Sequence, residues 1–358
     1  MKVLIIGGVA GGASCAARLR RLDEQADIVM VERGPYVSYA NCGLPYHIGG
    51  VIPEESSLLV ANEVTFRTMF NIDVRLHCDA VSIDATNKTV ELHYVKTGER
   101  VSESYDKLVL APGAKSVQPP LSGIDLPGIF QVRTVPDARE IRQWIEQGTE
   151  RLAGLYNYSG MQLVKPKRHA VVVGGGFIGL ETAENLLHAG FEVTIVEMLD
   201  QVLPPLDKEF AGLVGEFLES EGIRLALGDG VAAFKQCEGG GLKVETQAGK
   251  IHPADIVILA LGVRPNIELA KSANIDIGER GGIQVDEQMR TSQSDIFAVG
   301  DVIEVNDVVT GEPSLIALAG PANRQGRIAA DVIAGRNSRF RGTQGTSIIG
   351  LFGGGVAW

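Results

Sequence analysis

The chain has 358 residues, of which 45% are hydrophobic and 22% charged, and its formal net charge is −11. These values are typical of a globular protein of roughly two domains, and they argue against a collagen-like, membrane-spanning or nucleic-acid-binding protein. The cysteines Cys15, Cys42, Cys78 and Cys237 form neither a C-x-x-C pair nor a zinc-like group with histidine, and the N-terminus lacks a signal-peptide pattern. We therefore expect a cytoplasmic protein with no bound metal, no nucleic-acid partner and no membrane anchor.

The first third of the chain has the pattern of a parallel βαβ unit. Residues 2–6 predict a buried strand, residues 7–12 a glycine-rich turn, residues 13–22 a helix, and residues 28–31 a second strand that ends at Glu32. An alternating strand at 88–95 and a buried strand at 107–111 follow. We interpret this as a nucleotide-binding core with an inserted meander.

The second half repeats these features in the same order. The corresponding segments are the strand 170–173, the turn 174–179, the helix 180–189, the strand 193–196 ending at Glu197, the strand 242–246 and the buried strand 256–260. Two unrelated α/β domains could share such an order by coincidence, but six matching features favour duplication. The predicted fold is α/β with two Rossmann-like domains.

The second glycine turn has the context that a dinucleotide fingerprint requires. Gly174, Gly176 and Gly179 follow a strand and open a helix, where backbone N–H groups and the helix dipole can hold a pyrophosphate. Glu197 is placed to bind ribose hydroxyls and would repel a 2′-phosphate. NADH is therefore expected, with NADPH possible.

The first turn departs from this pattern. Gly7 and Gly12 occupy the outer glycine positions, but Val9 stands where the middle glycine belongs, and Gly11 would have to supply the missing flexibility. Glu32 is again well placed for a ribose. The candidate contacts of this first nucleotide are Gly7, Gly8, Val9, Ala10, Gly11, Gly12, Glu32 and Arg33.

Three further segments carry a resemblance to a known family. Residues 291–301 (TSQSDIFAVGD) resemble the second flavin motif of the pyridine nucleotide-disulfide oxidoreductases, and 110–113 (LAPG) and 259–262 (LALG) agree with it. The resemblance implies a glutathione-reductase-like fold with FAD on the first unit and NADH on the second. It adds Asp301, Ala111, Phe177, Ile178 and Gly262 to the cofactor contacts, with Asp301 on the ribityl chain and Phe177 over the nicotinamide pocket. A place in the buried core is an equally common reason for such a phenylalanine.

The resemblance also implies a domain organisation. Residues 1–115 and 291–335 would form the FAD-binding domain, and 116–290 the NAD(P)H-binding domain, with its nucleotide core starting at 168. Residues 336–358 resemble the opening of the family's C-terminal dimerisation domain, so we expect that domain to be truncated. The family is homodimeric, and most of the interface would then be missing. Residues 148–167 are expected to form a surface loop.

The cysteine pattern decides the subclass within this family. Cys42 has no partner cysteine at C-x-x-x-x-C spacing, and residues 38–46 (SYANCGLPY) are similar to the active-site segment of coenzyme A-disulfide reductases and related persulfide or polysulfide reductases. Pro45 suits the first turn of a helix, so Cys42 is expected at a helix N-terminus, where the thiolate is favoured. The other cysteines are interpreted as ordinary packing residues.

The substrate side can be predicted in part. Ser14, Arg18 and Arg21 lie on one helix face, and the resemblance assigns them, with Ser38, Asn41 and Asn323, to a coenzyme A moiety. A solvated basic face is an equally common reason for such arginines. The predicted function is NADH-dependent reduction of coenzyme A disulfide, coenzyme A persulfide or polysulfide through Cys42. The alternatives are an NADH oxidase or peroxidase using a cysteine sulfenic acid, and a catalytically idle flavin-binding protein.

Overall fold

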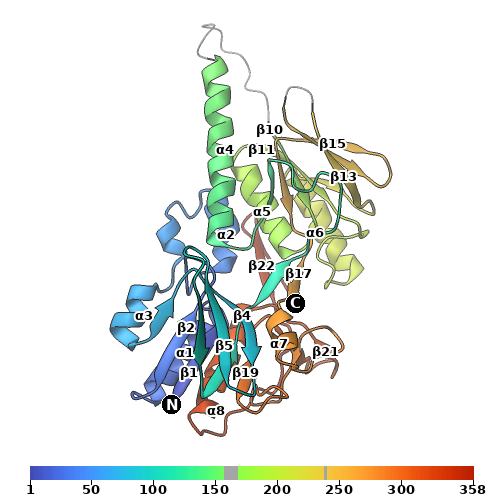
Figure 1. Ribbon diagram of the computed structural model, residues 1–358. Helices are drawn as coiled ribbons and strands as arrows, with labels where there is room; N and C mark the ends of the chain where they lie inside the picture. Colours follow the sequence, from blue (N-terminus) through green and yellow to red (C-terminus); the bar gives the residue numbers. More distant parts are fainter. Residues whose placement is uncertain (157–167, 238–239) are drawn as a thin grey trace. The chain divides into compact units, whose positions relative to one another are not determined.

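The computed structural model describes residues 1–156, 168–237 and 240–358, except for the side chains of 149–156. These residues form two compact units (Figure 1). Unit 1 comprises 1–39, 59–115 and 263–346, and unit 2 comprises 40–58, 116–262 and 347–358. The units differ from the predicted domain boundaries chiefly by placing 263–290 in unit 1 and 40–58 in unit 2.

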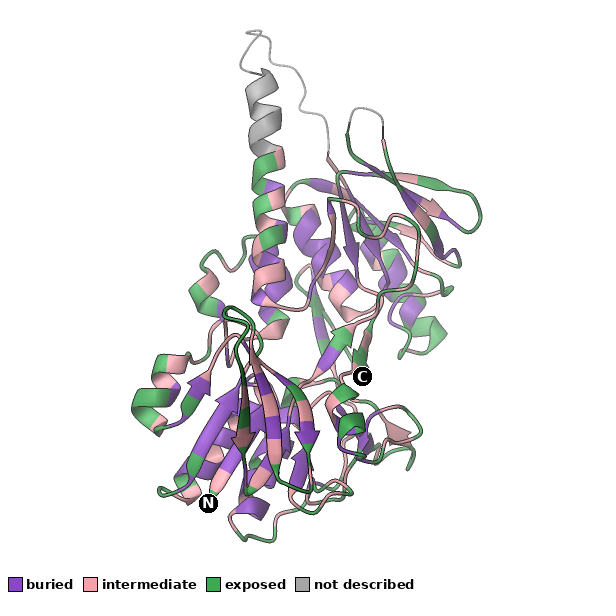
Figure 2. Cartoon of the chain, viewed as in Figure 1, coloured by how far each residue is buried: buried purple, intermediate pink, exposed green. Residues whose placement is uncertain are grey.

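Unit 1 is built on a five-stranded sheet whose pairings are all parallel. The strand order is β3 (Asp73–Arg75), β2 (Asp27–Val31), β1 (Lys2–Ile6), β7 (Lys107–Leu110) and β19 (Ile296–Ala298). Its central strands are almost wholly buried, as expected of a parallel sheet covered on both faces (Figure 2). Helices α1 (Ala10–Leu22) and α8 (Ala319–Ile333) pack closely on each other, and a Cβ at Gly326 would lie 2.1 Å from the Gly11 carbonyl oxygen.

The remaining elements of unit 1 lie outside this sheet. They are α3 (Glu63–Phe70), β4 (Cys78–Asp84), β5 (Thr89–Tyr94), β6 (Arg100–Ser104), β8 (Ala114–Ser116), β17 (Val263–Pro265), α7 (Glu268–Ser272), β18 (Ile283–Gln284), β20 (Ile303–Asn306) and β21 (Pro313–Ser314). Strands β4, β5 and β6 form the antiparallel meander that the alternating pattern predicted.

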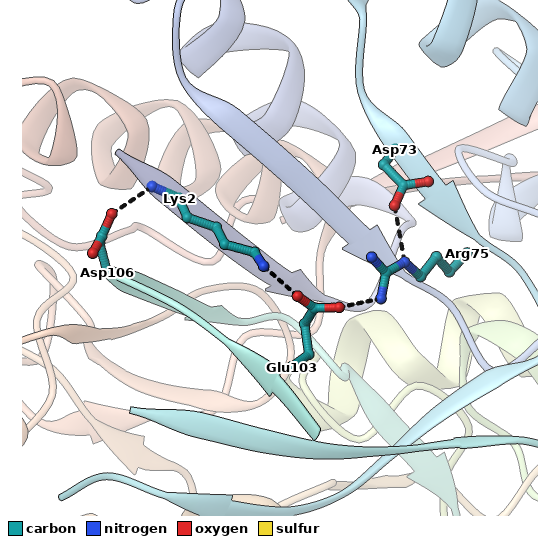
Figure 3. A network of polar contacts seen from close by, with 5 residues as sticks. All are labelled: Lys2, Asp73, Arg75, Glu103 and Asp106. Atoms are coloured by element: carbon teal, nitrogen blue, oxygen red, sulfur yellow. Dashed lines mark hydrogen bonds and ion pairs between the residues drawn. The ribbon is translucent and has the colours of Figure 1, made fainter. Parts of the chain in front are cut away.

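A polar network fastens the meander to the parallel sheet, at its central strand β1 and its edge strand β3 (Figure 3). The carboxylate of Glu103 on β6 accepts hydrogen bonds from Lys2 on β1 and from Arg75 on β3. Arg75 also binds Asp73 at 2.9 Å, and the Lys2 backbone N–H binds Asp106 at 2.6 Å. Burial opposes ionisation of Glu103, but the hydrogen bonds from Lys2 and Arg75 lower its pKa below the ordinary value.

Unit 2 has a second five-stranded parallel sheet. Its order is β12 (Arg224–Ala226), β11 (Phe191–Val196), β10 (Arg168–Val173), β16 (Ile256–Leu259) and β9 (Ile129–Gln131). The other elements of the unit are η1 (Asn41–Gly43), α2 (Leu44–Ile48), η2 (Glu55–Leu58), α4 (Val135–Tyr156), α5 (Phe177–His188), α6 (Lys208–Ser220), β13 (Val231–Gln236), β14 (Leu242–Thr246), β15 (Ile251–Ala254), β22 (Ile348–Leu351) and β23 (Gly354–Ala357). Strands β13, β14 and β15 form its meander.

The α/β prediction and the repeated order of elements are confirmed, with three corrections to element bounds. The predicted helices 13–22 and 180–189 begin earlier, at Ala10 and Phe177, because the last residues of each glycine turn already form the first helical turn. The predicted loop 148–167 is wrong for 148–156, which continue α4, and 157–167 lie outside the described residues.

Candidate functional site

The two glycine turns have the same hydrogen bonds and the same close contacts. The N–H of Gly7 donates to the Val31 carbonyl at 2.8 Å, and the N–H of Gly174 donates to the Val196 carbonyl at 2.9 Å. Both glycines have positive φ, 98° and 113°. A Cβ at Gly7 would lie 2.0 Å from the carbonyl oxygen of Ala111, so this predicted contact residue shapes the turn itself. Only glycine fits either position.

The last glycine of each turn brings the helix onto the strand that precedes it. A Cβ at Gly12 would lie 1.8 Å from the Gly7 carbonyl oxygen, and a Cβ at Gly179 would lie 2.0 Å from that of Gly174. These contacts explain why both halves need glycine there. The duplication predicted from the order of elements therefore extends to individual backbone contacts.

The acidic residues at the ends of β2 and β11 are held alike. Glu32 accepts hydrogen bonds from the Gly8 and Gly34 N–H groups, both at 2.9 Å. Glu197 accepts from Gly175 at 2.6 Å and from Leu199 at 2.8 Å. Each carboxylate is thus fixed beside its glycine turn, as ribose recognition requires.

The ends of α1 and α5 fit the pyrophosphate groups of two dinucleotides. Among the described residues, no side chain caps either helix N-terminus, so backbone N–H groups remain for an anion. Gly176, the N-cap of α5, has no described atom beyond its chain neighbours within 4 Å of an added Cβ. Packing within the chain therefore does not demand glycine here, whereas a closely approaching ligand would. Val9 is the N-cap of α1 and has a φ of −93° and a ψ of −125°.

Reversing the charge at Glu197 is expected to change the cofactor preference. Glu197→Arg replaces a carboxylate that repels a 2′-phosphate by a group that binds one, so the ratio of kcat/KM for NADPH to that for NADH should rise by roughly 10- to 100-fold. Steady-state kinetics with both nucleotides measure it. Glu197→Gln is the control, because it keeps an acceptor for the two N–H groups. An unchanged ratio in Glu197→Arg would rule out the ribose assignment.

The remaining cofactor candidates have these surroundings. Arg33 forms an ion pair with Asp79 at 3.0 Å. Gly300, directly before Asp301, has a φ of 83°, and its N–H donates to the Gln325 side chain on α8 at 2.8 Å. Gly262 has a φ of 85°. The turn before Asp301 is therefore anchored to α8.

Phe177, the first residue of α5, stacks on Trp358. This contact was not predicted from the sequence. The ring centroids lie 4.7 Å apart with an interplanar angle of 16°. Trp358 follows β23, and strand β22 of the same hairpin packs along α5. No motif marks Trp358, because only the antiparallel pairing of the hairpin brings it to the start of α5. Ile178 follows Phe177 in the first turn of the helix.

Cys42 lies in η1, which leads directly into α2. Pro45 occupies the first turn of α2, as predicted, and the Cys42 side chain is exposed. The side chain of Asn41 donates to the Arg133 carbonyl at 3.2 Å. All four cysteines are free thiols in the described chain, and Cys15 and Cys78 are buried. Cys42 is the exposed thiol of the four, while Cys237 is half-buried.

The structure brings some of the predicted substrate residues together. The Ser14 hydroxyl donates to the Asn323 side-chain oxygen at 2.7 Å because α1 and α8 pack side by side. Arg18, however, forms an ion pair with Asp331 at 2.8 Å. The Arg21 guanidinium lies over the Phe70 ring, 5.5 Å from its centroid. Both arginines thus have partners within unit 1. Ser38 belongs to unit 1 and Asn41 to unit 2.

Comparison with known proteins identifies the family. The model of the pyridine nucleotide-disulphide oxidoreductases matches residues 1–326. The chain belongs to this family. The predicted oxidoreductase class and its cofactors, FAD and a nicotinamide nucleotide, are confirmed with it. No helix in the described part of the chain has the length and apolarity needed to cross a membrane.

Three relatives illustrate the range of named activities. A crystal structure of reduced CoADR-RHD from Bacillus anthracis is 45% identical with a TM-score of 0.92, and the match covers 99% of this chain and 61% of that one. A CoA-dependent NAD(P)H sulfur oxidoreductase of Pyrococcus abyssi is 36% identical over 97% of this chain and 72% of its own length. An NADH oxidase of Methanocaldococcus jannaschii is 37% identical, with coverages of 95% and 71%. The chain therefore spans about three fifths to three quarters of these proteins.

Proposed function

We propose that this chain is an NADH-dependent flavoenzyme that reduces coenzyme A disulfide, coenzyme A persulfide or polysulfide through Cys42. The observation that carries the proposal is the exposed free thiol of Cys42, at the entrance to α2, in a chain with two dinucleotide turns. A single cysteine can store oxidation only as a mixed disulfide, a persulfide or a sulfenic acid. A sulfur acceptor that forms the first two suits such a site.

The proposed chemistry needs one nucleophile and one electron source. FAD, when bound, supplies two electrons taken from NADH. The Cys42 thiolate attacks one sulfur of the acceptor, forms a mixed disulfide and releases the other sulfur as a thiolate. Two electrons and one proton then break the mixed disulfide, which regenerates the Cys42 thiolate and frees the second thiol. The released thiolate takes up one further proton.

Relatives support the choice of acceptor. The Pyrococcus abyssi protein is named a CoA-dependent NAD(P)H sulfur oxidoreductase. Two of the residues that the family resemblance assigns to coenzyme A, Ser14 and Asn323, are hydrogen-bonded to each other. We propose these two side chains as coenzyme A contacts. Arg18 and Arg21 would have to exchange their present partners to bind a phosphate. The cytoplasmic location and the homodimer with a truncated interface stay predictions.

An anaerobic NADH titration of the purified chain tests this proposal. We expect NADH to bleach the flavin absorbance and to produce a long-wavelength band that Cys42→Ser removes. Subsequent addition of coenzyme A disulfide should restore the oxidised spectrum in the wild type alone. A bound flavin that NADH does not reduce would support the catalytically idle alternative and contradict the proposal. Purification without flavin would contradict both.

The second candidate is an NADH oxidase or peroxidase. It is favoured by the Methanocaldococcus jannaschii relative and by the solvent access of Cys42, which a small oxidant could also reach. Rates with oxygen and hydrogen peroxide, measured beside rates with the sulfur acceptors, separate the two. Faster turnover with oxygen or peroxide would assign the chain to this second class.

A further inference from the structure

Cys42 lies in a loop of unit 2, residues 40–58, that is closed at its base. The Ala40 N–H donates to the Leu58 carbonyl at 2.8 Å, and the chain directly before and after this loop belongs to unit 1. A Cβ at Gly43 would lie 2.8 Å from the buried Leu58 side chain, so η1 packs on the closed base. The Cys42 loop is therefore a compact excursion of the chain into unit 2.

The helices inside the Cys42 loop are too short to keep their shape alone. η1 has three residues, α2 five and η2 four. Isolated helices shorter than about 12–15 residues are marginal in water, because forming the first turn is unfavourable. The exposed Cys42 side chain takes its direction from the backbone of η1. That direction therefore depends on the elements against which the loop packs.

Helix α4 of the same unit packs on α2 and η2 and holds the loop through two arginines (Figure 1). The Arg139 guanidinium forms a bidentate ion pair with Glu55 on η2, at 2.7 Å from Nε to Oε2 and 2.6 Å from Nη2 to Oε1. The Nη1 group of Arg142, one turn further along α4, donates to the Pro53 carbonyl at 2.7 Å. A bidentate pair fixes the angle between its partners as well as their distance.

A third contact lies directly beside the thiol in the chain. The Asn41 side chain donates to the Arg133 carbonyl at 3.2 Å, in the turn that leads into α4. Asp137 stabilises that turn, because its Oδ2 accepts from the N–H groups of Arg133 at 3.1 Å and Thr134 at 2.8 Å. The three anchors thus come from α4 and the turn before it, and they hold both the beginning and the end of the loop.

The helix that carries these anchors is itself firmly packed. Val135, Ala138 and Ile141 recur every three residues on α4 and are 0% exposed, so one face of the helix is buried. The Trp144 ring meets the Phe130 ring of β9 edge-on, with centroids 5.6 Å apart. A helix fixed to unit 2 in this way can stabilise a loop whose own helices are too short to do so.

We propose that Arg139 and Arg142 are positioning residues for the Cys42 thiol. This rests on the proposed function, in which the Cys42 sulfur attacks the acceptor in one defined direction. A displacement of about 1 Å at a reacting atom can lower a rate about a hundredfold. The two arginines act through Glu55 and the Pro53 carbonyl, which fix the loop and with it the direction of the thiol. They are therefore positioning residues and not catalytic ones.

Turnover with coenzyme A disulfide tests the proposal. Arg139→Met and Arg142→Met keep the apolar stem and lose the donors, so each should lower kcat about three- to tenfold, and the double variant about 30-fold or more. The long-wavelength band that NADH produces should weaken in the double variant, because the thiol is no longer held in one direction. Flavin reduction by NADH should keep its wild-type rate, since this step does not use the thiol. An equal loss of flavin reduction, or an undiminished kcat, would overturn the proposal.

Conservative and reversed variants separate positioning from a loss of folding. Arg139→Lys keeps the charge but cannot form both bonds, so it should lose less activity than Arg139→Met. Glu55→Arg places two guanidinium groups together, and adding Arg139→Glu should restore kcat several-fold. Glu146→Gln is the matched control, because it removes the pair of Arg142 with Glu146 within α4, at 3.1 Å, and should behave like the wild type. The absence of any rescue in the reversed pair would contradict the proposal.

Hydrogen exchange tests the anchors without any acceptor. The N–H groups of Gly43 and Ile52 each donate to a backbone carbonyl of the loop at 3.0 Å. Their exchange should become about tenfold faster or more in the Arg139→Met, Arg142→Met double variant, while the amides of β10 and β11 keep their wild-type rates. Faster exchange throughout unit 2 would indicate a purely structural role and overturn the proposal, as would unchanged exchange in the loop. The expected exchange in an enzyme that reduces no sulfur acceptor would contradict the proposed function alone.

Discussion

Replacing Cys42 with serine is expected to lower NADH-dependent reduction of coenzyme A disulfide by about 10³-fold or more, because the hydroxyl cannot act as the nucleophile or store the oxidised sulfur. Flavin content and flavin reduction by NADH should stay near wild-type values. Stopped-flow measurement of flavin reduction and steady-state turnover with the disulfide give the two quantities separately.

Cys237 offers the matched control for this experiment. It is a half-buried free thiol of the same unit, at the end of the β13 strand and outside the segment 38–46. Cys237→Ser should keep acceptor turnover within about twofold of the wild type. Equal losses in the two variants, or undiminished turnover in Cys42→Ser, would exclude Cys42 as the reacting thiol.

Two glycine substitutions at the start of α5 are expected to have opposite consequences. In Gly179→Ala the new Cβ would lie 2.0 Å from the Gly174 carbonyl oxygen, so the helix must shift, and unit 2 should lose roughly 1–3 kcal/mol or more of stability. In Gly176→Ala the Cβ enters open space, so the stability of the protein should hardly change. The affinity for NADH should nevertheless fall about tenfold or more, because the methyl group occupies space that the pyrophosphate needs.

Urea unfolding and NADH titration of the same two variants measure these effects. The comparison is informative because a glycine-rich turn that binds no nucleotide would show the stability loss of Gly179→Ala but no loss of NADH affinity in Gly176→Ala. If Gly176→Ala bound NADH as tightly as the wild type, the assignment of this helix end to the nucleotide would fail. Gly190→Ala is unsuitable as a control, because its φ of 87° would strain alanine.

Local patterns were enough to predict the parts of this molecule that depend on chain-adjacent residues. The strands 2–6 and 170–173, the glycine turns after them, and Glu32 and Glu197 at the next strand ends all lie where the sequence predicts them. Glycine at the last position of each turn is required by a close contact with the first glycine of the same turn, and such a local requirement is visible in the sequence. Pro45 likewise marks the first turn of α2.

Contacts between distant segments decided the rest. Trp358 reaches Phe177, and the Phe352 N–H reaches Glu184, only because the hairpin of β22 and β23 packs along α5. The partners of Arg18 and Arg21 come from α8 and α3. The sequence of α1 alone does not predict these contacts, because both partners lie far away in the chain. The raised pKa of Glu181 likewise depends on burial, a property of the assembled unit. The sequence by itself determined the family, the two glycine turns and the candidate active-site cysteine, Cys42. Each of these depends on a short motif of neighbouring residues. Only the tertiary structure decided which side chains are already paired and which carboxyl group burial keeps protonated up to about pH 7, because burial and pairing arise from residues far apart in the chain.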